Sequence, residues 1–248
     1  MMLGQLLLGL VAERAFEAIY KSTLGTTELR LEDEREGRTD TDYRVLNGAG
    51  RPVFRMNIKF HGTLFRDARK LVDLDPEDCF ALATYKIKQG LDKQDSEVLP
   101  YVFVVVSCPV SALAVGAAIP KEFVDLSSLV HASRRISGKR RIEEKIVGYL
   151  ADGRVPQFAA TLTDLQAKIA AAPWRILSAR RADQLLREKL FERVYAVRVR
   201  GFTRSYRNAE VDMHLSLSRD MTPLPDLLKK IAEVGLHGVT GMFERGLL

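Results

Sequence analysis

The chain of 248 residues has little cysteine and no long apolar run. Its two cysteines, Cys79 and Cys108, are too few and too far apart for a disulfide framework or a zinc site, so we expect buried thiols in a reducing compartment. No stretch reaches the roughly 18 uninterrupted apolar residues that a membrane span needs. With 46% hydrophobic and 28% charged residues, the composition is that of a globular chain. We expect a cytoplasmic protein without a membrane span.

The N-terminal segment is strongly apolar. Leu3 to Val11 looks like the core of a signal peptide, but no basic residue precedes it and no small-residue cleavage site follows it. Apolar residues continue to recur at helical spacing as far as Tyr20. This pattern predicts a helix over residues 3–22 that ends near Gly25.

The charge is unevenly distributed along the chain. Residues 1–130 contain 16 Lys and Arg against 19 Asp and Glu, a net −3, whereas residues 131–248 contain 22 against 13, a net +9. Clustered cations gain affinity for a phosphate backbone by releasing its counterions. The second half is therefore a candidate for contact with a polyanion, although a solvated basic surface explains the excess equally well.

The first hundred residues predict a helix, three strands, a second helix and a buried strand. After the first helix, alternation and turn residues predict strands over 27–33, 42–46, 53–60 and 99–106. A helix that begins at Pro76 is predicted over 76–91, before the last of these strands. The second and third strands are joined by a turn-forming segment, so we expect a hairpin. The last strand is continuously apolar, which is typical of a strand covered on both faces.

Patterns in the second half are weaker. They predict helices over 121–132, 139–151, 161–171 and 178–192, strands over 194–200 and 211–218, and a closing helix over 224–234. We expect Trp174, the single tryptophan, to lie in the core.

The predicted hairpin carries the residues with the clearest chemical meaning. Asp42 begins its first strand, and Asn57, Lys59 and His61 share one face of the second strand because side chains alternate with period two. A turn of this length brings Asp42 close to Asn57 and Lys59, and Asp40 points to the same face. An acid, a second oxygen ligand and an amine are therefore expected to meet at one sheet edge. For His61 we favour an incidental surface position.

This arrangement resembles the core of the PD-(D/E)xK nucleases, the restriction-endonuclease-like superfamily. The resemblance rests on the order of elements over residues 3–108 and on the sequences Asp42-Tyr43-Arg44-Val45 and Arg55-Met56-Asn57-Ile58-Lys59. It implies an α/β fold, with an αβββαβ core in which helices flank a mixed central sheet, followed here by an α+β C-terminal extension. We accordingly expect a core over residues 1–130 and a basic α+β region over residues 131–248, which can belong to the same domain.

The resemblance also implies a catalytic site. In this family the aspartate and the acidic residue two before the lysine bind Mg²⁺, and the lysine positions the attacking water. Carried over, Asp42 and Asn57 are the metal ligands, Asp40 substitutes or assists, and Lys59 is the catalytic cation. The implied cofactor is Mg²⁺ or Mn²⁺, which suits oxygen ligands and phosphodiester chemistry.

Asn57 departs from the family pattern, which has Glu, Asp or sometimes Gln at this position. Its amide oxygen is neutral and a weaker ligand, so we expect a lower affinity for Mg²⁺. Glu13, with Glu17 one turn later, matches the glutamate that many members carry on the first helix. Alternatively, these two carboxylates form a solvated helix face with Arg14 and Lys21.

Two basic segments are candidates for contact with nucleic acid. Backbone phosphates attract arginine and lysine, and neighbouring aromatic rings allow base stacking. The candidate residues are Arg134, Arg135, Lys139, Arg140 and Arg141 in the first segment and Arg198, Arg200 and Arg204 in the second. Both segments are also compatible with ordinary solvated surface. Glu210, Asp212 and His214 alternate onto one strand face, but we do not expect a second metal site there.

Three functions follow from these observations. The first is a Mg²⁺-dependent DNA endonuclease of the restriction or repair type that hydrolyses phosphodiester bonds. The second is a DNA-binding protein that keeps the nuclease fold without its metal chemistry, as Asn57 and the net charge of +9 in residues 131–248 suggest. The third is a structural or oligomerisation subunit that docks its N-terminal helix through Leu6 and Leu10. Independently of these functions, Asp40 and Asp42 can simply cap a strand and Lys59 can be an exposed sheet residue. DNA is the expected partner, and the sequence is compatible with either a monomer or a homodimer.

Overall fold

The structure is a computed structural model that describes residues 2–23, 29–35, 41–110, 115, 119–120, 156–197 and 210–248. Its first part contains α1 (Met2–Thr23), β1 (Arg30–Asp33), β2 (Tyr43–Leu46), β3 (Pro52–His61), α2 (Ala68–Val72), β4 (Cys79–Ala83), α3 (Thr84–Glu97) and β5 (Tyr101–Ser107). The predicted first helix, hairpin and buried strand are confirmed. The helix predicted from Pro76 is wrong in its first part, because residues 79–83 form β4 and the helix begins only at Thr84.

The second part contains α7 (Pro156–Ala170), β6 (Trp174–Ser178), α8 (Ala179–Glu188), α9 (Leu190–Arg193), β7 (Val194–Val197), β8 (Glu210–Ser216), α10 (Leu217–Asp220), β9 (Thr222–Pro223) and α11 (Leu224–Glu244). The helices over 121–132 and 139–151 were predicted for residues outside the described part of the chain. Strand β6 was not predicted, and it carries Trp174, which is buried as expected.

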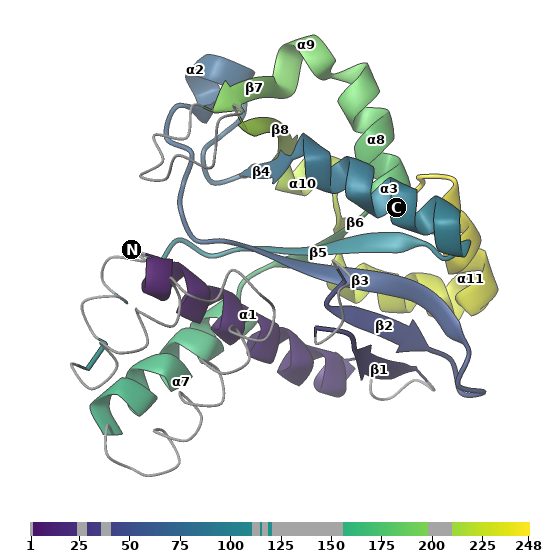
Figure 1. The fold of residues 1–248 in the computed structure, drawn as a ribbon, viewed down its shortest axis with the longest axis horizontal. Coiled ribbons are helices and arrows are strands. Elements are labelled where there is room, and N and C mark those ends of the chain that lie inside the picture. The colour runs from purple at the N-terminus through teal and green to yellow at the C-terminus, as the bar shows by residue number, and fades with distance from the viewer. Residues whose placement is uncertain are drawn as a thin grey trace.

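A six-stranded mixed sheet forms the centre of the molecule, in the order β1-β2-β3-β5-β6-β9 (Figure 1). Strands β1, β2 and β3 form an antiparallel meander, and β3 pairs in parallel with β5. A parallel pair needs a crossover connection, and the segment containing α2, β4 and α3 provides it. Strand β6 then pairs antiparallel with β5, so the sheet includes strands from both halves of the chain. A second, antiparallel sheet has the order β4-β8-β7.

Helices flank the central sheet on both faces, as Figure 1 shows. One core lies between the sheet and helices α1, α7 and α11, and it includes Phe54, Met56 and Ile58 of β3. The other core lies against α3, α8 and the second sheet, and it includes Phe103 and Val105 of β5. Strand β5 is covered on both faces, as predicted from its continuous apolar sequence.

Helix α1 packs its apolar residues into the first core of the same chain. Leu10 is only 4% exposed, and Leu7, Leu8 and Val11 are buried with it. The side chain of Leu6 lies outside what the structure describes. The face that the third hypothesis would use for docking is therefore covered at Leu10 by the chain itself. Within the described ranges, none of the helices combines the length and the apolar character needed to span a membrane.

The turn between β2 and β3 fixes the geometry of the hairpin. The Asn47 side-chain oxygen accepts hydrogen bonds from the backbone N–H groups of Ala49 and Arg51, at 3.0 and 2.9 Å. Gly50 has a φ of +73°, a left-handed conformation that glycine adopts without steric cost. This local hydrogen bonding of asparagine, followed by a glycine, explains why the turn forms here and holds the two strands in register.

Candidate functional site

The hairpin brings Asp42 and Asn57 to facing positions on neighbouring strands. Tyr43 pairs with Met56, and the N–H of Asp42 donates to the carbonyl of Met56 at 3.2 Å. The register therefore places Asp42 opposite Asn57. Because side chains alternate along a strand, Lys59 lies on the same face of β3 as Asn57, two residues further on. The structure thus brings together the acid, amide and amine that the sequence predicted.

The Asp42 carboxylate also completes the backbone pairing of β3. Its Oδ2 accepts a hydrogen bond from the N–H of Ile58 at 2.7 Å. Strand β2 begins at Tyr43, so this side chain takes the place of a backbone acceptor just beyond the strand end. The contact fixes the orientation of the carboxylate relative to Asn57. It is also the strand-capping role that we considered as an alternative for Asp42.

The face of β3 that carries these residues is partly buried. Asn57 is 6% exposed, and Lys59 is half-buried beside Val105 of β5. Arg55, two residues before Asn57, is 3% exposed and forms ion pairs with Glu34 and Glu97. These two carboxylates hold the Arg55 guanidinium in place, so a fixed cation lies near the start of this face.

The donor set at the hairpin fits a hard divalent cation in type but has a low charge. Asp42 and Asn57 offer a carboxylate and an amide oxygen, which are ligands that Mg²⁺ accepts. Asp40, the other predicted ligand, lies outside the described residues. Among the residues that the structure describes, no group of three or more His, Cys, Asp and Glu side chains could hold a metal ion. A cation at the hairpin would therefore take most of its ligands from water or substrate.

Glu13 and Glu17 belong to a separate ionic cluster around Arg35. The Arg35 guanidinium lies 3.0 Å from Glu13 and 2.9 Å from Glu17, and it also contacts Asp33. Burial alone would lower the pKa of Arg35, but its hydrogen bonds to Asp33 and Glu13 raise that pKa above the ordinary value. The guanidinium therefore stays charged and neutralises the two glutamates.

This cluster lies on the α1 side of the sheet. The Tyr43 hydroxyl donates a hydrogen bond to Glu17 at 2.7 Å, and burial together with this bond raises the pKa of Tyr43. Tyr43 packs in the same core as α1, whereas Asp42 precedes it and points to the opposite face by alternation. The structure thus does not bring Glu13 or Glu17 together with Asp42 and Asn57.

The predicted nucleic-acid contacts lie outside the described residues. They are Arg134, Arg135, Lys139, Arg140, Arg141, Arg198, Arg200 and Arg204.

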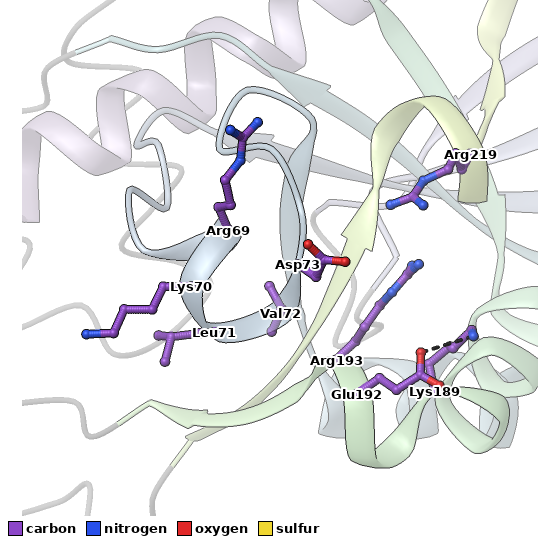
Figure 2. Close-up of a pocket in the computed structure, with 9 residues that line it drawn as sticks. All are labelled: Arg69, Lys70, Leu71, Val72, Asp73, Lys189, Glu192, Arg193 and Arg219. Atoms are coloured by element: carbon purple, nitrogen blue, oxygen red, sulfur yellow. Dashed lines mark hydrogen bonds and ion pairs between the residues drawn. The ribbon is translucent and has the colours of Figure 1, made fainter.

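A basic cavity of about 520 Å³ lies between α2, α9 and α10, and the sequence did not reveal it. We call it the α2–α9 cavity. Figure 2 shows its lining residues: Arg69, Lys70, Leu71, Val72 and Asp73 from α2 and its C-terminal end, Lys189, Glu192 and Arg193 from α9 and the preceding residue, and Arg219 from α10. Five of these side chains are cationic and two are acidic, a net charge of +3.

Several of these cations form ion pairs. Lys189 lies 3.1 Å from Glu192, and Arg193 lies 2.6 Å from Asp220, which does not line the cavity. Lys70 and Arg219 differ, because no carboxylate of a described residue lies within ion-pair distance of either. Their charge is thus left for a ligand. The adjacent Arg69 and Lys70 are visible in the sequence, but no sequence pattern links them to Arg219.

His61 and His214 lie at the junction between the central sheet and the second sheet. The His61 ring contacts Phe80 edge-on, and the His214 ring stacks on Phe65 with centroids 4.7 Å apart. His214 is 1% exposed. Burial lowers the pKa of both histidines, and the proximity of His214 lowers that of His61 further. His61 is therefore a half-buried residue that packs against Phe80, so it is less exposed than the incidental surface histidine that we favoured.

His214 shows the same packing role on β8. Its Nδ1 lies 3.2 Å from the backbone carbonyl of Arg193, a hydrogen bond that partly offsets the lowering of its pKa. A buried ring that stacks on Phe65 serves the junction of the two sheets.

No family model, no curated protein and no solved structure matches this chain.

Proposed function

We propose that the chain is a Mg²⁺-dependent DNA endonuclease of the restriction or repair type, with Asp42, Asn57 and Lys59 at its catalytic site. The observation that carries the proposal is the register of β2 and β3, which sets Asp42 opposite Asn57 with Lys59 on the same face. The order of elements supports it. Apart from α2 and β4, which lie between β3 and α3, the order α1-β1-β2-β3-α3-β5 with parallel β3 and β5 is the arrangement expected of a restriction-endonuclease-like fold.

The proposed hydrolysis depends on the ability of these side chains to bind Mg²⁺ and to orient a water molecule. Asp42 and Asn57 would hold the Mg²⁺ through their oxygens, and the bound ion would neutralise the charge that develops on the phosphodiester. Lys59 presents a half-buried ammonium group on the same face. In partial burial such a charge acts more strongly than in water, so Lys59 is suited to orient a water molecule or a phosphate oxygen.

The test is cleavage of supercoiled plasmid and of oligonucleotides by purified protein with Mg²⁺ or Mn²⁺. Asp42→Asn keeps an oxygen that can accept from Ile58 N–H but removes the charge, so we expect a loss of about 100-fold or more in rate. Lys59→Met should give a similar loss. Asp92→Asn and Lys88→Met, both at exposed positions of α3, are matched controls that should leave the rate unchanged. Cleavage that survives both hairpin substitutions would refute the proposal.

Asn57→Asp provides a gain-of-function test at the same site. A second carboxylate opposite Asp42 adds one negative charge to the ligand set, so we expect half-maximal activity at a lower Mg²⁺ concentration. If the requirement for Mg²⁺ is unchanged while Asp42→Asn abolishes cleavage, Asn57 is not a ligand.

A second candidate function is DNA binding without cleavage. It is favoured by the neutral amide at Asn57 and by the position of Glu13 and Glu17, which Arg35 neutralises on the other side of the sheet. This function predicts DNA binding that weakens steeply with salt and does not change when Mg²⁺ is removed. Binding that is insensitive to salt would exclude it.

A further inference from the structure

The α2–α9 cavity combines a concave shape with positive charge that no carboxylate of a described residue pairs. Lys70 lies at an exposed position of α2, and Arg219 lies at an exposed position of α10. The Nε–H of Arg219 donates to the Ser216 hydroxyl at 3.3 Å, which leaves the two terminal NH₂ groups for other partners. Guanidinium and ammonium groups are the ones that proteins use to bind phosphate, and Arg219 and Lys70 both line this cavity from opposite sides.

The ion pairs around the cavity differ in how firmly they hold their cations. Arg69 pairs with Asp75 at 3.1 Å, but both side chains are mostly exposed, so the pair adds little stability. Arg193 differs, because its side chain and that of Asp220 are both largely buried, and Asp220 also accepts from the N–H of Ser216 at 2.7 Å. Arg193 is therefore a fixed cation of the cavity lining, whereas Arg69 and Lys70 are exposed cations on α2.

An exposed aromatic ring lies on α9, the helix that contributes two residues to the cavity lining, although the ring itself is not part of that lining. Phe191 lies on α9 between Lys189 and Arg193, and its side chain is 98% exposed. A fully exposed phenylalanine offers a surface on which a nucleobase can stack, and cations beside aromatic rings are typical of sites for single nucleic-acid strands.

From these observations we propose that the α2–α9 cavity is a phosphate-binding site that holds the backbone of a nucleic-acid strand. The choice of ligand rests on the proposed function, whereas the site is separate from the hairpin. Arg193 and Arg219 contact phosphate oxygens inside the cavity, Lys70 contacts the next phosphate at the rim, and Phe191 stacks on a base. Asp73 opposes binding, since it adds a negative charge to the lining.

The test measures the binding of a labelled single-stranded oligonucleotide by fluorescence anisotropy at several salt concentrations. Lys70→Gln/Arg219→Gln should weaken binding about tenfold or more at low salt. It should also reduce the slope of log K against log salt by about 1.4, because two phosphate contacts are lost. The matched control is Lys229→Gln/Lys230→Gln, which removes two charges from α11 on the other side of the central sheet and should have little effect.

Asp73→Asn tests whether removing a negative charge from the cavity strengthens oligonucleotide binding. Asp73 has a left-handed conformation with a φ of +50°, which asparagine also adopts readily, so the substitution removes charge without backbone strain. We expect binding to tighten several-fold. A residue with only a structural role would not tighten binding when it is replaced.

The outcomes separate this proposal from the proposed function. If the double substitution and Asp73→Asn both leave oligonucleotide binding unchanged while the protein still cleaves DNA, the cavity proposal is wrong and the nuclease proposal stands. If the protein neither binds nor cleaves DNA but binds ATP, and the double substitution removes that binding, the phosphate site stands with a free nucleotide as its ligand. In that case the nucleic-acid part of the proposal is overturned.

Discussion

The hairpin site and the α2–α9 cavity hold their polar groups in opposite ways. At the hairpin, backbone pairing and the Ile58 N–H fix Asp42 opposite a nearly buried Asn57. At the cavity, Lys70 and Arg219 extend from exposed positions of two short helices. A fixed arrangement suits chemistry that depends on the placement of single atoms, whereas long exposed cations suit contact with a charged chain of variable shape. Under the two proposals, catalysis and binding are divided between two regions.

Replacing Arg55 gives the largest expected effect and tests how far the hairpin depends on buried charge. Arg55→Ala removes a guanidinium that is almost fully buried and that pairs with Glu34 and Glu97, while Glu34 keeps its second ion pair, with Arg44. We expect the free energy of unfolding to fall by about 3 kcal/mol. Urea denaturation followed by circular dichroism measures this change.

The matched change at the cavity is Arg69→Ala. Arg69 pairs with Asp75 at the exposed rim, so its loss should change stability by less than about 0.5 kcal/mol. Equal losses of stability for Arg55→Ala and Arg69→Ala would remove the distinction between a rigid hairpin and an adjustable cavity.

Replacing Asp42 should have an intermediate effect on stability. Asp42→Ala removes the acceptor of the Ile58 N–H, and we expect a loss of about 1–2 kcal/mol. Asp42→Asn should lose much less, since its amide oxygen can accept the same bond. Thermal unfolding of the two variants, with Asp73→Asn as the cavity control, distinguishes these cases. If Asp42→Ala is as stable as the unmodified protein, the carboxylate does not organise the hairpin.

The smallest expected effect is the change of stability with pH near neutral pH, because His61 and His214 are neutral there. Burial lowers the pKa of both residues, so below the ordinary histidine pKa of about 6.5 the unfolded chain binds more protons than the folded protein. Stability is therefore retained above this pH and lost as the pH falls through it. Urea denaturation at several pH values between about 8 and about 5, a range that includes the ordinary histidine pKa, measures this loss of stability.

His214→Phe keeps an aromatic ring next to Phe65, and it should reduce the loss of stability at low pH. His237→Asn, at an exposed position of α11, is the control and should follow the curve of the unmodified protein. A curve for His214→Phe that coincides with the unmodified protein would show that His214 does not contribute to the pH dependence.

Much of the first part of the fold could be predicted because its patterns are local. The period of the apolar residues predicted α1, and Asn47 with Gly50 predicted the turn of the hairpin. The hairpin register then followed, which is why the proximity of Asp42 and Asn57 was also predictable.

Features that depend on distant partners could not be predicted in this way. Residues 79–83 follow an acidic segment typical of a helix start, yet they form β4 because β8, with residues 210–216, pairs with them. This tertiary pairing overrides the local preference. The cavity needs the same contact between distant segments, since α2 and α10 come to line one cavity only when β4 pairs with β8. Strand β6 was missed because its five residues continue directly into α8.

The position of β5 has a consequence during synthesis on the ribosome. Its valine-rich edge is paired in the native protein by β6, but β5 ends at Ser107 and β6 begins only at Trp174. At roughly 5–20 residues per second, translation leaves that edge uncovered for several seconds. An apolar strand with an open edge is a template for association with other chains. Nascent chains that stall between these two strands are therefore the species most exposed to aggregation, and the ones that a chaperone would have to shield.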